Sequence, residues 1–193
     1  VGQFGTGLRE QGYRGRIISF EPVQSVFQTL AATAQADGDW DAHNFALGAA
    51  PARATINVAE LPVFSSLLPT TGAAAAFDNT AVATHSETIE ARTLNEFVSN
   101  LSGNILLKID TQGYEKQVLE GGRQVLSRLD RVLMELPIIH LYEGTWRFHE
   151  AVAYMAESNF VPTQIHPVNF HSKDDVSLVD VDCLFRPWDR TID

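Results

Sequence analysis

Cysteine and long apolar runs are the scarcest features of this 193-residue sequence. The one cysteine, Cys183, cannot form a disulfide within the chain, so nothing in the sequence calls for an oxidising compartment. Its setting, "VDVDCLF", is typical of a small buried side chain. No apolar run approaches the roughly 20 residues that span a bilayer, and there is no signal peptide. We therefore expect a cytoplasmic protein without a membrane partner.

Positive charge is also scarce. Fourteen Lys and Arg stand against 24 Asp and Glu, which gives a formal net charge of −10. Binding to nucleic acid or to an anionic membrane requires a basic face, so this balance argues against both. His166 and His171 have a spacing that matches no usual metal site, and no cysteine cluster assists them. We expect no metal, and the sequence does not indicate an oligomeric state.

Apolar runs typical of strands alternate with segments of helical spacing along most of the chain. Strands are expected at 16–20, 43–49, 52–60, 87–93, 104–110, 130–137, 160–168 and 176–187. Helices are expected at 6–11, 23–38, 94–101, 114–129 and 147–159. This alternation predicts one α/β domain over residues 1–193, with a mostly parallel sheet and an antiparallel C-terminal hairpin.

Residues 62–88 interrupt this alternation. The segment is rich in Ala, Thr, Ser and Pro and has no sustained period. A segment of this length without an element often forms a lid or binding loop. We predict a lid or substrate loop here, and a plain surface loop is the alternative.

Three of the predicted strands end in a carboxylate: Glu21, Asp110 and Glu135. Ligands of open α/β sheets bind outside the carboxyl ends of the strands. An acid after the second strand of a nucleotide-binding half usually accepts hydrogen bonds from ribose hydroxyls, and Glu21 has that position. The glycines before it, from Gly2 onward, would let the backbone approach a cofactor closely.

Lys108 and Asp110 are two residues apart on one predicted strand, so their side chains share a face. A lysine inside "ILLKI" needs a partner, and Glu115 on the next helix is the candidate. Asp110 lies at the strand tip, where a functional role is expected. His140 follows the strand that ends in Glu135 and is a second candidate general base, although a packed or surface histidine is the alternative.

The motifs "GYRGRIISFEP", "NFALG", "FSSLL", "LLKIDTQGYEKQVLEG", "LMELP" and "VDCLF", in this order, resemble the FkbM family of S-adenosylmethionine-dependent methyltransferases. The most specific is "LKIDTQGYE", where the family typically has Lys-x-Asp-x-Glu/Gln-Gly-x-Glu. The resemblance implies a Rossmann-like class I methyltransferase sheet in three layers. Members usually carry Asp-x-Gly-x-Asn-x-Gly at the end of the first strand, and only its last glycine has a counterpart here, Gly2. We therefore expect the first strand to be absent from this sequence and the fragment itself to bind the cofactor poorly.

The resemblance also assigns residues to S-adenosylmethionine. Gly2 would border its methionyl part, Glu21 would hold the ribose hydroxyls, and Asn44 to Ala46 would lie near the adenine. Asp110 and Gln112 would lie beside the transferred methyl group, with Asp110 as first and His140 as second candidate base. The acceptor is expected to be a hydroxyl on a small molecule, secondary metabolite or glycan. A nicotinamide-dependent oxidoreductase and a catalytically silent Rossmann-like binding module are the alternatives.

Overall fold

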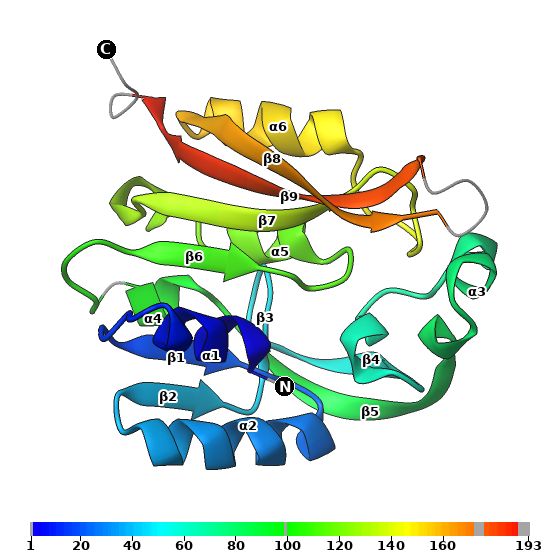
Figure 1. Ribbon diagram of the computed structural model, residues 1–193, viewed down its shortest axis with the longest axis horizontal. Helices are drawn as coiled ribbons and strands as arrows, with labels where there is room; N and C mark the ends of the chain where they lie inside the picture. The colour runs from blue at the N-terminus through cyan, green and yellow to red at the C-terminus, as the bar shows by residue number, and fades with distance from the viewer. Residues whose placement is uncertain (1, 99, 172–175, 189–193) are drawn as a thin grey trace.

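The computed structural model describes residues 2–98, 100–171 and 176–188 (Figure 1). The strands are β1 Ile17–Phe20, β2 Trp40–His43, β3 Ala46–Leu47, β4 Ala52–Ala59, β5 Ala83–Arg92, β6 Leu106–Ile109, β7 Arg131–Pro137, β8 Phe160–Phe170 and β9 Leu178–Pro187. The helices are α1 Gln3–Glu10, α2 Gln24–Asp37, α3 Gly72–Phe77, α4 Asn95–Val98, α5 Glu115–Glu120 and α6 Phe148–Glu157. Short 3-10 helices occupy Pro62–Phe64, Asn79–Ala81 and Leu126–Arg128. Within the described residues, no helix is long and apolar enough to cross a membrane.

The strands form three hydrogen-bonded groups: β1–β2, β3–β5–β4 and β6–β7–β9–β8. The pairs β1–β2, β3–β5 and β6–β7 are parallel. The pairs β4–β5, β7–β9 and β8–β9 are antiparallel. The predicted antiparallel C-terminal hairpin is therefore confirmed as β8–β9. A single, mostly parallel sheet in three layers stays a prediction, because the described pairings fall into three groups and two of these are mixed.

Most predicted elements form within a few residues of the expected bounds. The N-terminal helix ends at Glu10, and α2 ends where Gly38 adopts φ 84°, a left-handed conformation that glycine reaches without strain. The strand expected at 43–49 is wrong in its bounds, because β2 occupies Trp40–His43 and β3 only Ala46–Leu47. The charged Asp41 inside β2 concealed the apolar pattern of that strand.

The helix expected at 114–129 is also shorter than predicted. Helix α5 ends at Glu120, and Gly121 and Gly122 follow it. A Cβ at Gly121 would overlap the carbonyl oxygen of Gly48, so only glycine permits this close approach of two chain segments. The apolar side chains predicted to lie on one side of this helix, Val118, Leu119, Val125 and Leu126, are nevertheless all buried.

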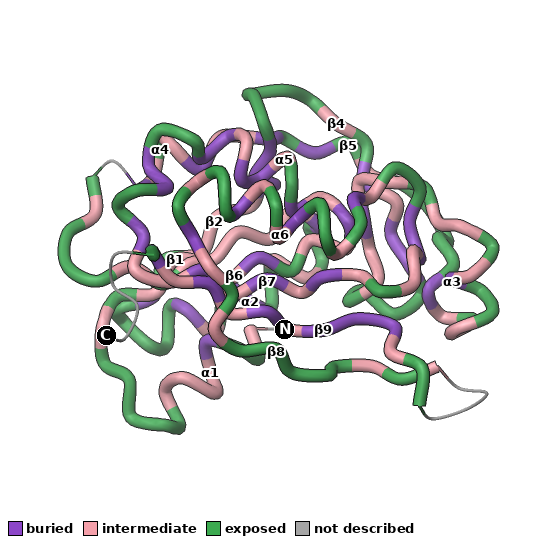
Figure 2. Tube along the Cα trace, turned by 90° about the horizontal axis from the view of Figure 1, so that it is seen from above, coloured by how far each residue is buried: buried purple, intermediate pink, exposed green. Residues whose placement is uncertain are grey.

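The main core lies around β7 and β9, where many of the residues are buried (Figure 2). Cys183 on β9 is fully buried, as expected, and burial raises the pKa of its thiol to about 11. Helices α5 and α6 lie behind β6–β9, and α1 lies on the opposite, front side (Figures 1 and 2). The front face of the β6–β7–β9–β8 group is thereby left accessible next to α1.

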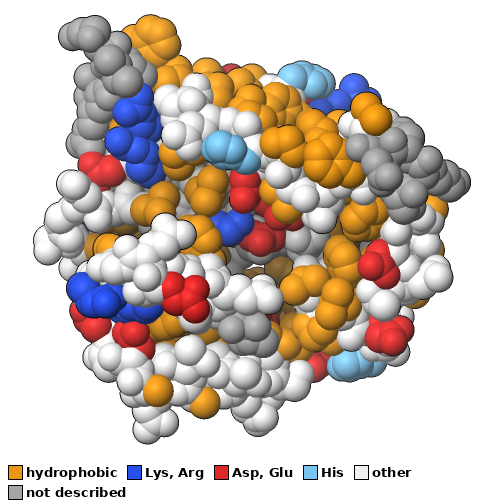
Figure 3. All heavy atoms as spheres, in the orientation of Figure 1, with side chains coloured by type: hydrophobic (Ala, Val, Ile, Leu, Met, Phe, Trp, Pro, Cys, Tyr) orange, Lys and Arg blue, Asp and Glu red, His pale blue; other side chains and the backbone are white. Residues whose placement is uncertain are grey.

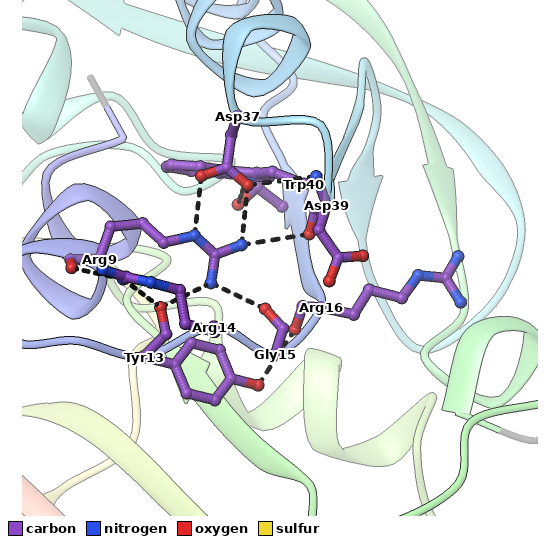
Figure 4. A network of polar contacts seen from close by, with 9 residues as sticks. Arg9, Tyr13, Arg14, Gly15, Arg16, Asp37, Asp39 and Trp40 are labelled. Atoms are coloured by element: carbon purple, nitrogen blue, oxygen red, sulfur yellow. Dashed lines mark hydrogen bonds and ion pairs between the residues drawn. The ribbon is translucent and has the colours of Figure 1, made fainter.

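Arg9 fastens α1 to the turn between α2 and β2 (Figure 4). Its Nε and Nη2 donate to the two carboxylate oxygens of Asp37 over 2.7 and 2.8 Å. Its Nη1 also donates to the carbonyl of Gly15, and Nη2 to that of Asp39. This paired geometry anchors the C-terminal end of α1 to that turn.

Residues 62–88 contain more regular structure than the sequence predicts. They include α3, two of the 3-10 helices and the first residues of β5. The segment contacts residues 137–145: Thr71 donates from its backbone nitrogen to the carbonyl of Leu141 and from Oγ1 to that of His140, each over 2.8 Å. Side chains of small size, mainly alanine, form these packed turns without the apolar period that reveals a longer helix. Its role as a lid stays a prediction.

Candidate functional site

A cavity of about 1320 Å³ lies between the facing edges of β1 and β6 and extends to the carboxyl ends of both strands. Five residues that the sequence assigned to a cofactor line this one cavity: Gly2, Glu21, Ala46, Asp110 and Gln112. In the view of Figure 3, charged side chains gather beside a hollow near the middle of the face, with apolar side chains around them. The fold thus brings together residues that are up to 110 positions apart in the sequence.

Glu21 follows β1 directly and is partly buried. Its Oε1 accepts a hydrogen bond from the backbone nitrogen of Val23 over 2.8 Å. Burial raises the pKa of the Glu21 carboxyl, and the bond from Val23 opposes that effect. In the part of the chain that is described, Oε2 has no hydrogen-bond partner, so one carboxylate oxygen of a fixed side chain is available to hydroxyl donors.

Asn44 and His140 lie differently from the other predicted site residues. The side-chain amide of Asn44 donates to the carbonyls of Glu21 and Pro22, over 2.9 and 3.2 Å, and so fixes the chain where it leaves β1. Neither Asn44 nor His140 lines the large cavity. The carbonyl of His140 accepts the bond from Thr71, which places its backbone beside the segment 62–88.

Gln112 lies in the turn after β6 and adopts φ 53°, which is uncommon for a residue with a side chain. Ser66 Oγ, almost fully buried, donates to the carbonyl of Gln112 over 2.7 Å. On either side of Gln112, the backbone nitrogens of Thr111 and Gly113 donate to Glu115 Oε1, over 3.1 and 3.0 Å. Hydrogen bonds on three sides therefore hold this residue in its strained conformation.

Glu115 caps this turn and does not pair with Lys108, so the predicted Lys108–Glu115 ion pair is wrong. Glu115 is 1% exposed, and its Oε1 also accepts from the hydroxyl of Thr111 over 3.1 Å. Burial raises the pKa of the Glu115 carboxyl above its usual value. At the first turn of a helix, a carboxylate reaches backbone donors of the preceding turn more easily than a side chain on a neighbouring strand.

Lys108 pairs instead with two carboxylates on its own face of the sheet. Its Nζ lies 3.4 Å from Asp110 Oδ2 and 3.4 Å from Asp182 Oδ1. Asp110 is on the same side because it is two residues away, and Asp182 arrives from β9. The lysine side chain is 19% exposed, so it is partly removed from water. Its positive charge is balanced by the two carboxylates.

Glu135 on β7 completes a cluster of polar side chains, although the sequence analysis gave it no role. Gln112 Nε2 donates to Asp110 Oδ1 over 2.9 Å and to Glu135 Oε1 over 3.2 Å, so one amide bridges the two carboxyls. Burial raises the pKa of Glu135 to about 8, and the negative charges of Asp110 and Asp180 add to the effect. The feature of the sequence that could have indicated a role for Glu135 is its position near the end of a buried strand.

Tyr142 and Asp180 border the same cluster. The Tyr142 hydroxyl lies 2.9 Å from Gln112 Oε1 and 3.0 Å from the carbonyl of Phe64. Its pKa is raised, first by burial and then by the negative charge of Glu135. Asp180 is buried on β9 and accepts from the backbone and side chain of Asn169. No sequence spacing connects these residues with Asp110, because their proximity depends on strand order.

The described residues contain no group of three or more His, Cys, Asp or Glu side chains arranged to hold a metal ion. The cluster of Lys108, Asp110, Gln112 and Glu135 offers hydrogen-bond acceptors and a negative potential around Lys108. Such a site suits hydroxyl groups and positively charged ligands.

Comparisons with known proteins agree on one family. The sequence profile of the methyltransferase FkbM domain matches residues 4–162, more than half of the chain. The fold is similar to the crystal structure of methyltransferase FkbM from Methylobacillus flagellatus KT, with a TM-score of 0.57 and 14% sequence identity. That similarity covers 96% of this chain and 40% of the other, so this chain spans less than half the length of that protein. No curated protein gives a significant match.

Proposed function

Because the chain belongs to the FkbM methyltransferase family, we propose that it binds S-adenosylmethionine and transfers the methyl group to a hydroxyl of a sugar or secondary metabolite. The observation that carries this proposal is the single cavity lined by Gly2, Glu21, Ala46, Asp110 and Gln112. These residues come from four separate segments, and the α/β fold brings them to the carboxyl ends of neighbouring strands. That is where open α/β sheets bind their ligands.

The residues present fit the proposed cofactor. Glu21 presents a carboxylate oxygen that can accept from ribose hydroxyls, and its other oxygen is fixed by Val23. Gly2, at φ 69°, lines the cavity without a side chain, and a Cβ at this position would lie only 3.2 Å from Leu30 and 3.3 Å from Trp40. Asp110 and Gln112 provide negative charge and hydrogen-bond acceptors near the end of β6. Bound S-adenosylmethionine would supply a methyl group on a positively charged sulfur.

The main task of this chain would be to orient the two reactants, because methyl transfer requires them in line. A carboxylate that holds a cation in the ground state does not by itself accelerate transfer. Acceleration requires a group that acts on the acceptor, and a hydroxyl acceptor benefits from a base. Asp110 lies at the cavity and can take that role. His140 does not line the cavity, and its assignment as second base rests on its position after β7.

We also propose that residues 1–193 form one domain whose sheet accommodates a further strand between β1 and β6. Within the described residues β1 pairs only with β2, and β6 only with β7. Their free edges line the same cavity, and their arrows point the same way in Figure 1. Apolar side chains on both edges, among them Ile18 and Leu107, would suit a buried strand. Such a strand would join the β1–β2 and β6–β7–β9–β8 groups into one mostly parallel sheet.

Isothermal calorimetry with S-adenosylmethionine, S-adenosylhomocysteine and NAD tests the proposed function. In a longer polypeptide in which a strand precedes Gly2, we expect binding of the first two and none of NAD, since residues 1–193 alone are expected to bind the cofactor poorly. Glu21→Ala should weaken S-adenosylmethionine binding by roughly 1–3 kcal/mol, the scale of a lost hydrogen bond to a charged group. Glu90→Ala is the matched control, because Glu90 is exposed on β5 and lines no part of the cavity. Binding of NAD instead, or equal affinity of the folded Glu21→Ala variant, would contradict the assignment.

A further inference from the structure

Gln112 forms part of the wall between two cavities of very different size. Asp110 and Gln112 line the large cavity, whereas Gln112 and Glu135 line a second, small one of about 30 Å³. That volume is enough for a water molecule. Because the Gln112 amide donates to both carboxyls, a continuous chain of polar groups leads from one cavity to the other.

The small cavity has polar walls that are not fully satisfied by the protein. Glu115 Oε2 and Thr145 Oγ1 are buried and have no hydrogen-bond partner, and both residues line this cavity. Glu115 is 1% exposed, so its second oxygen cannot reach bulk solvent directly. A buried polar atom without a partner is costly, so a cavity with such walls suits a small hydrogen-bonding molecule such as water.

Glu135 has the electrostatic surroundings of a group that changes its charge. From β6 it faces the negative charge of Asp110 and the positive charge of Lys108, and from β9 the charge of Asp180. Asp182 is opposite Glu135 in the β7–β9 register, and Tyr142 and Glu115, which line the same small cavity, are further titratable neighbours. Lys108 is already shared by Asp110 and Asp182, each at 3.4 Å. Burial and the charges of Asp110 and Asp180 raise the pKa of Glu135 to about 8, so Glu135 keeps its proton near neutral pH.

We propose that the Asp110–Gln112–Glu135 chain responds to the charge of the ligand in the large cavity: a cation that binds beside Asp110 causes Glu135 to release its proton. The reason is the field of Asp110, whose negative charge favours the protonated form of Glu135. A positive charge near Asp110 offsets that field. Only an O–H bond of Glu135 breaks, and the proton passes to water through the polar small cavity.

This inference rests on the proposed function for the identity of the cation, a sulfonium. Glu135 does not line the large cavity, so it would not touch the acceptor hydroxyl and would act only through Gln112, which donates to both carboxyls. With the sulfonium present, Glu135 would be a carboxylate, and its negative charge would add to that of Asp110. After methyl transfer the sulfur would be neutral, so Glu135 would take up its proton again. Glu135 would therefore be charged only while the methyl donor is bound.

Two measurements test the proposal, and the first needs no cofactor. In protein labelled with ¹³C at glutamate side chains, the Glu135 signal should titrate near pH 8. In Asp110→Asn its midpoint should fall by about one unit or more, the usual effect of removing a neighbouring like charge. Glu135→Gln assigns the signal, and the exposed Glu143→Gln is the matched control. An unchanged Glu135 midpoint in folded Asp110→Asn overturns the proposal.

The second measurement is proton release on binding by the longer polypeptide in which a strand precedes Gly2, from calorimetry at pH 7.5 in phosphate and in Tris. S-adenosylmethionine, a cation at sulfur, should release a larger fraction of a proton than S-adenosylhomocysteine, which is neutral there. Glu135→Gln should abolish the difference, and Glu143→Gln should retain it. Equal release with both ligands in the wild type overturns this inference and leaves the methyltransferase proposal intact. Absence of binding of either ligand overturns both.

Discussion

Glu115 Oε1 accepts a hydrogen bond from the backbone nitrogen of Gly113 over 3.0 Å, and this contact fixes the turn that presents Gln112. The same oxygen accepts from the backbone and hydroxyl of Thr111. A nearly fully buried side chain thereby determines the backbone of the turn two residues before it. The sequence shows the motif "DTQGYE" but not this role, since a glutamate at that position could equally face a neighbouring strand.

Glu115→Ala should destabilise the protein strongly. It removes the acceptor of three donors, and each buried donor left unsatisfied costs about 1–3 kcal/mol. Glu115→Gln keeps an acceptor oxygen and should lower the melting temperature much less. If both variants melt at the same low temperature, the turn depends on the negative charge and not on the acceptor.

The stability of the wild type should also depend on pH through Glu115. Burial raises its pKa in the folded state above the unfolded value, so the folded state binds a proton that the unfolded state has lost. This contribution is fully present below the unfolded pKa and is lost as pH rises through the folded pKa. Urea unfolding between pH 5 and 9 should therefore show a steeper fall of stability in the wild type than in Glu115→Gln. Parallel curves would contradict a raised pKa.

Lys108→Met should act mainly through Asp110 and Asp182, which would lose their shared positive partner. We expect a loss of about 1 kcal/mol, since the pair is only partly shielded from water. Adding Asp182→Asn should restore most of it, whereas adding Glu115→Leu should not. Restoration by Glu115→Leu in thermal melts would reinstate the pairing that the structure contradicts.

Features that depend on residues close together in the sequence were predicted correctly, whereas contacts between residues far apart in the sequence were not. Local signals predicted α2 with its terminal Gly38, strand β7, and the hairpin β8–β9. The alternating pattern of Lys108 and Asp110 correctly placed both on one face. Their third partner, Asp182, lies on β9, 72 positions after Asp110, and no local pattern reveals a cross-strand neighbour at that distance.

The residues of the candidate site also fall into those that the sequence predicted and those that it did not. Glu21 and Asp110 were predicted because they follow strands, and parallel strands end at a common edge, whereas Gln112 was assigned from the family resemblance. Tyr142 and Ser66 were missed because their contacts with Gln112 depend on how the segment 62–88 packs. Small residues without a helical period conceal such packing in the sequence. The break of α5 at Gly121 was missed because it depends on contact with Gly48.

The free edge of β1 makes a prediction for hydrogen exchange. Ile17 and Glu21 donate from their backbone nitrogens to carbonyls on the β2 side, so the N–H groups of Ile18 and Phe20 point to the cavity. In residues 1–193 alone, these two amides should exchange much faster than that of Ile17. In a longer polypeptide in which a strand precedes Gly2, they should become protected. Equal protection of all three amides in the short chain would contradict an open edge.

Ser66 connects the segment 62–88 to the candidate site, and the neighbouring Ser65 offers a control for its role. Ser66 Oγ donates to the carbonyl of Gln112 and accepts from the backbone nitrogen of Leu68, over 2.7 and 3.0 Å. Ser65 Oγ instead accepts from the backbone nitrogen of Ala59 over 3.2 Å, away from the turn. The two serines thus have similar local bonds, but only Ser66 contacts Gln112.

Ser66→Ala should release the 62–88 segment from the Gln112 turn and leave a strained φ of 53° with one support fewer. Limited proteolysis should cut this segment faster in Ser66→Ala than in the wild type, because cleavage follows local opening. S-adenosylmethionine should bind several-fold more weakly, since Gln112 lines the proposed cofactor cavity. Ser65→Ala should change cleavage slightly and weaken binding less than Ser66→Ala, because Ser65 lines the same cavity but does not contact Gln112. If both variants bind the cofactor like the wild type, the segment packs against the turn without controlling it, and its proposed function as a lid over the acceptor loses its structural basis.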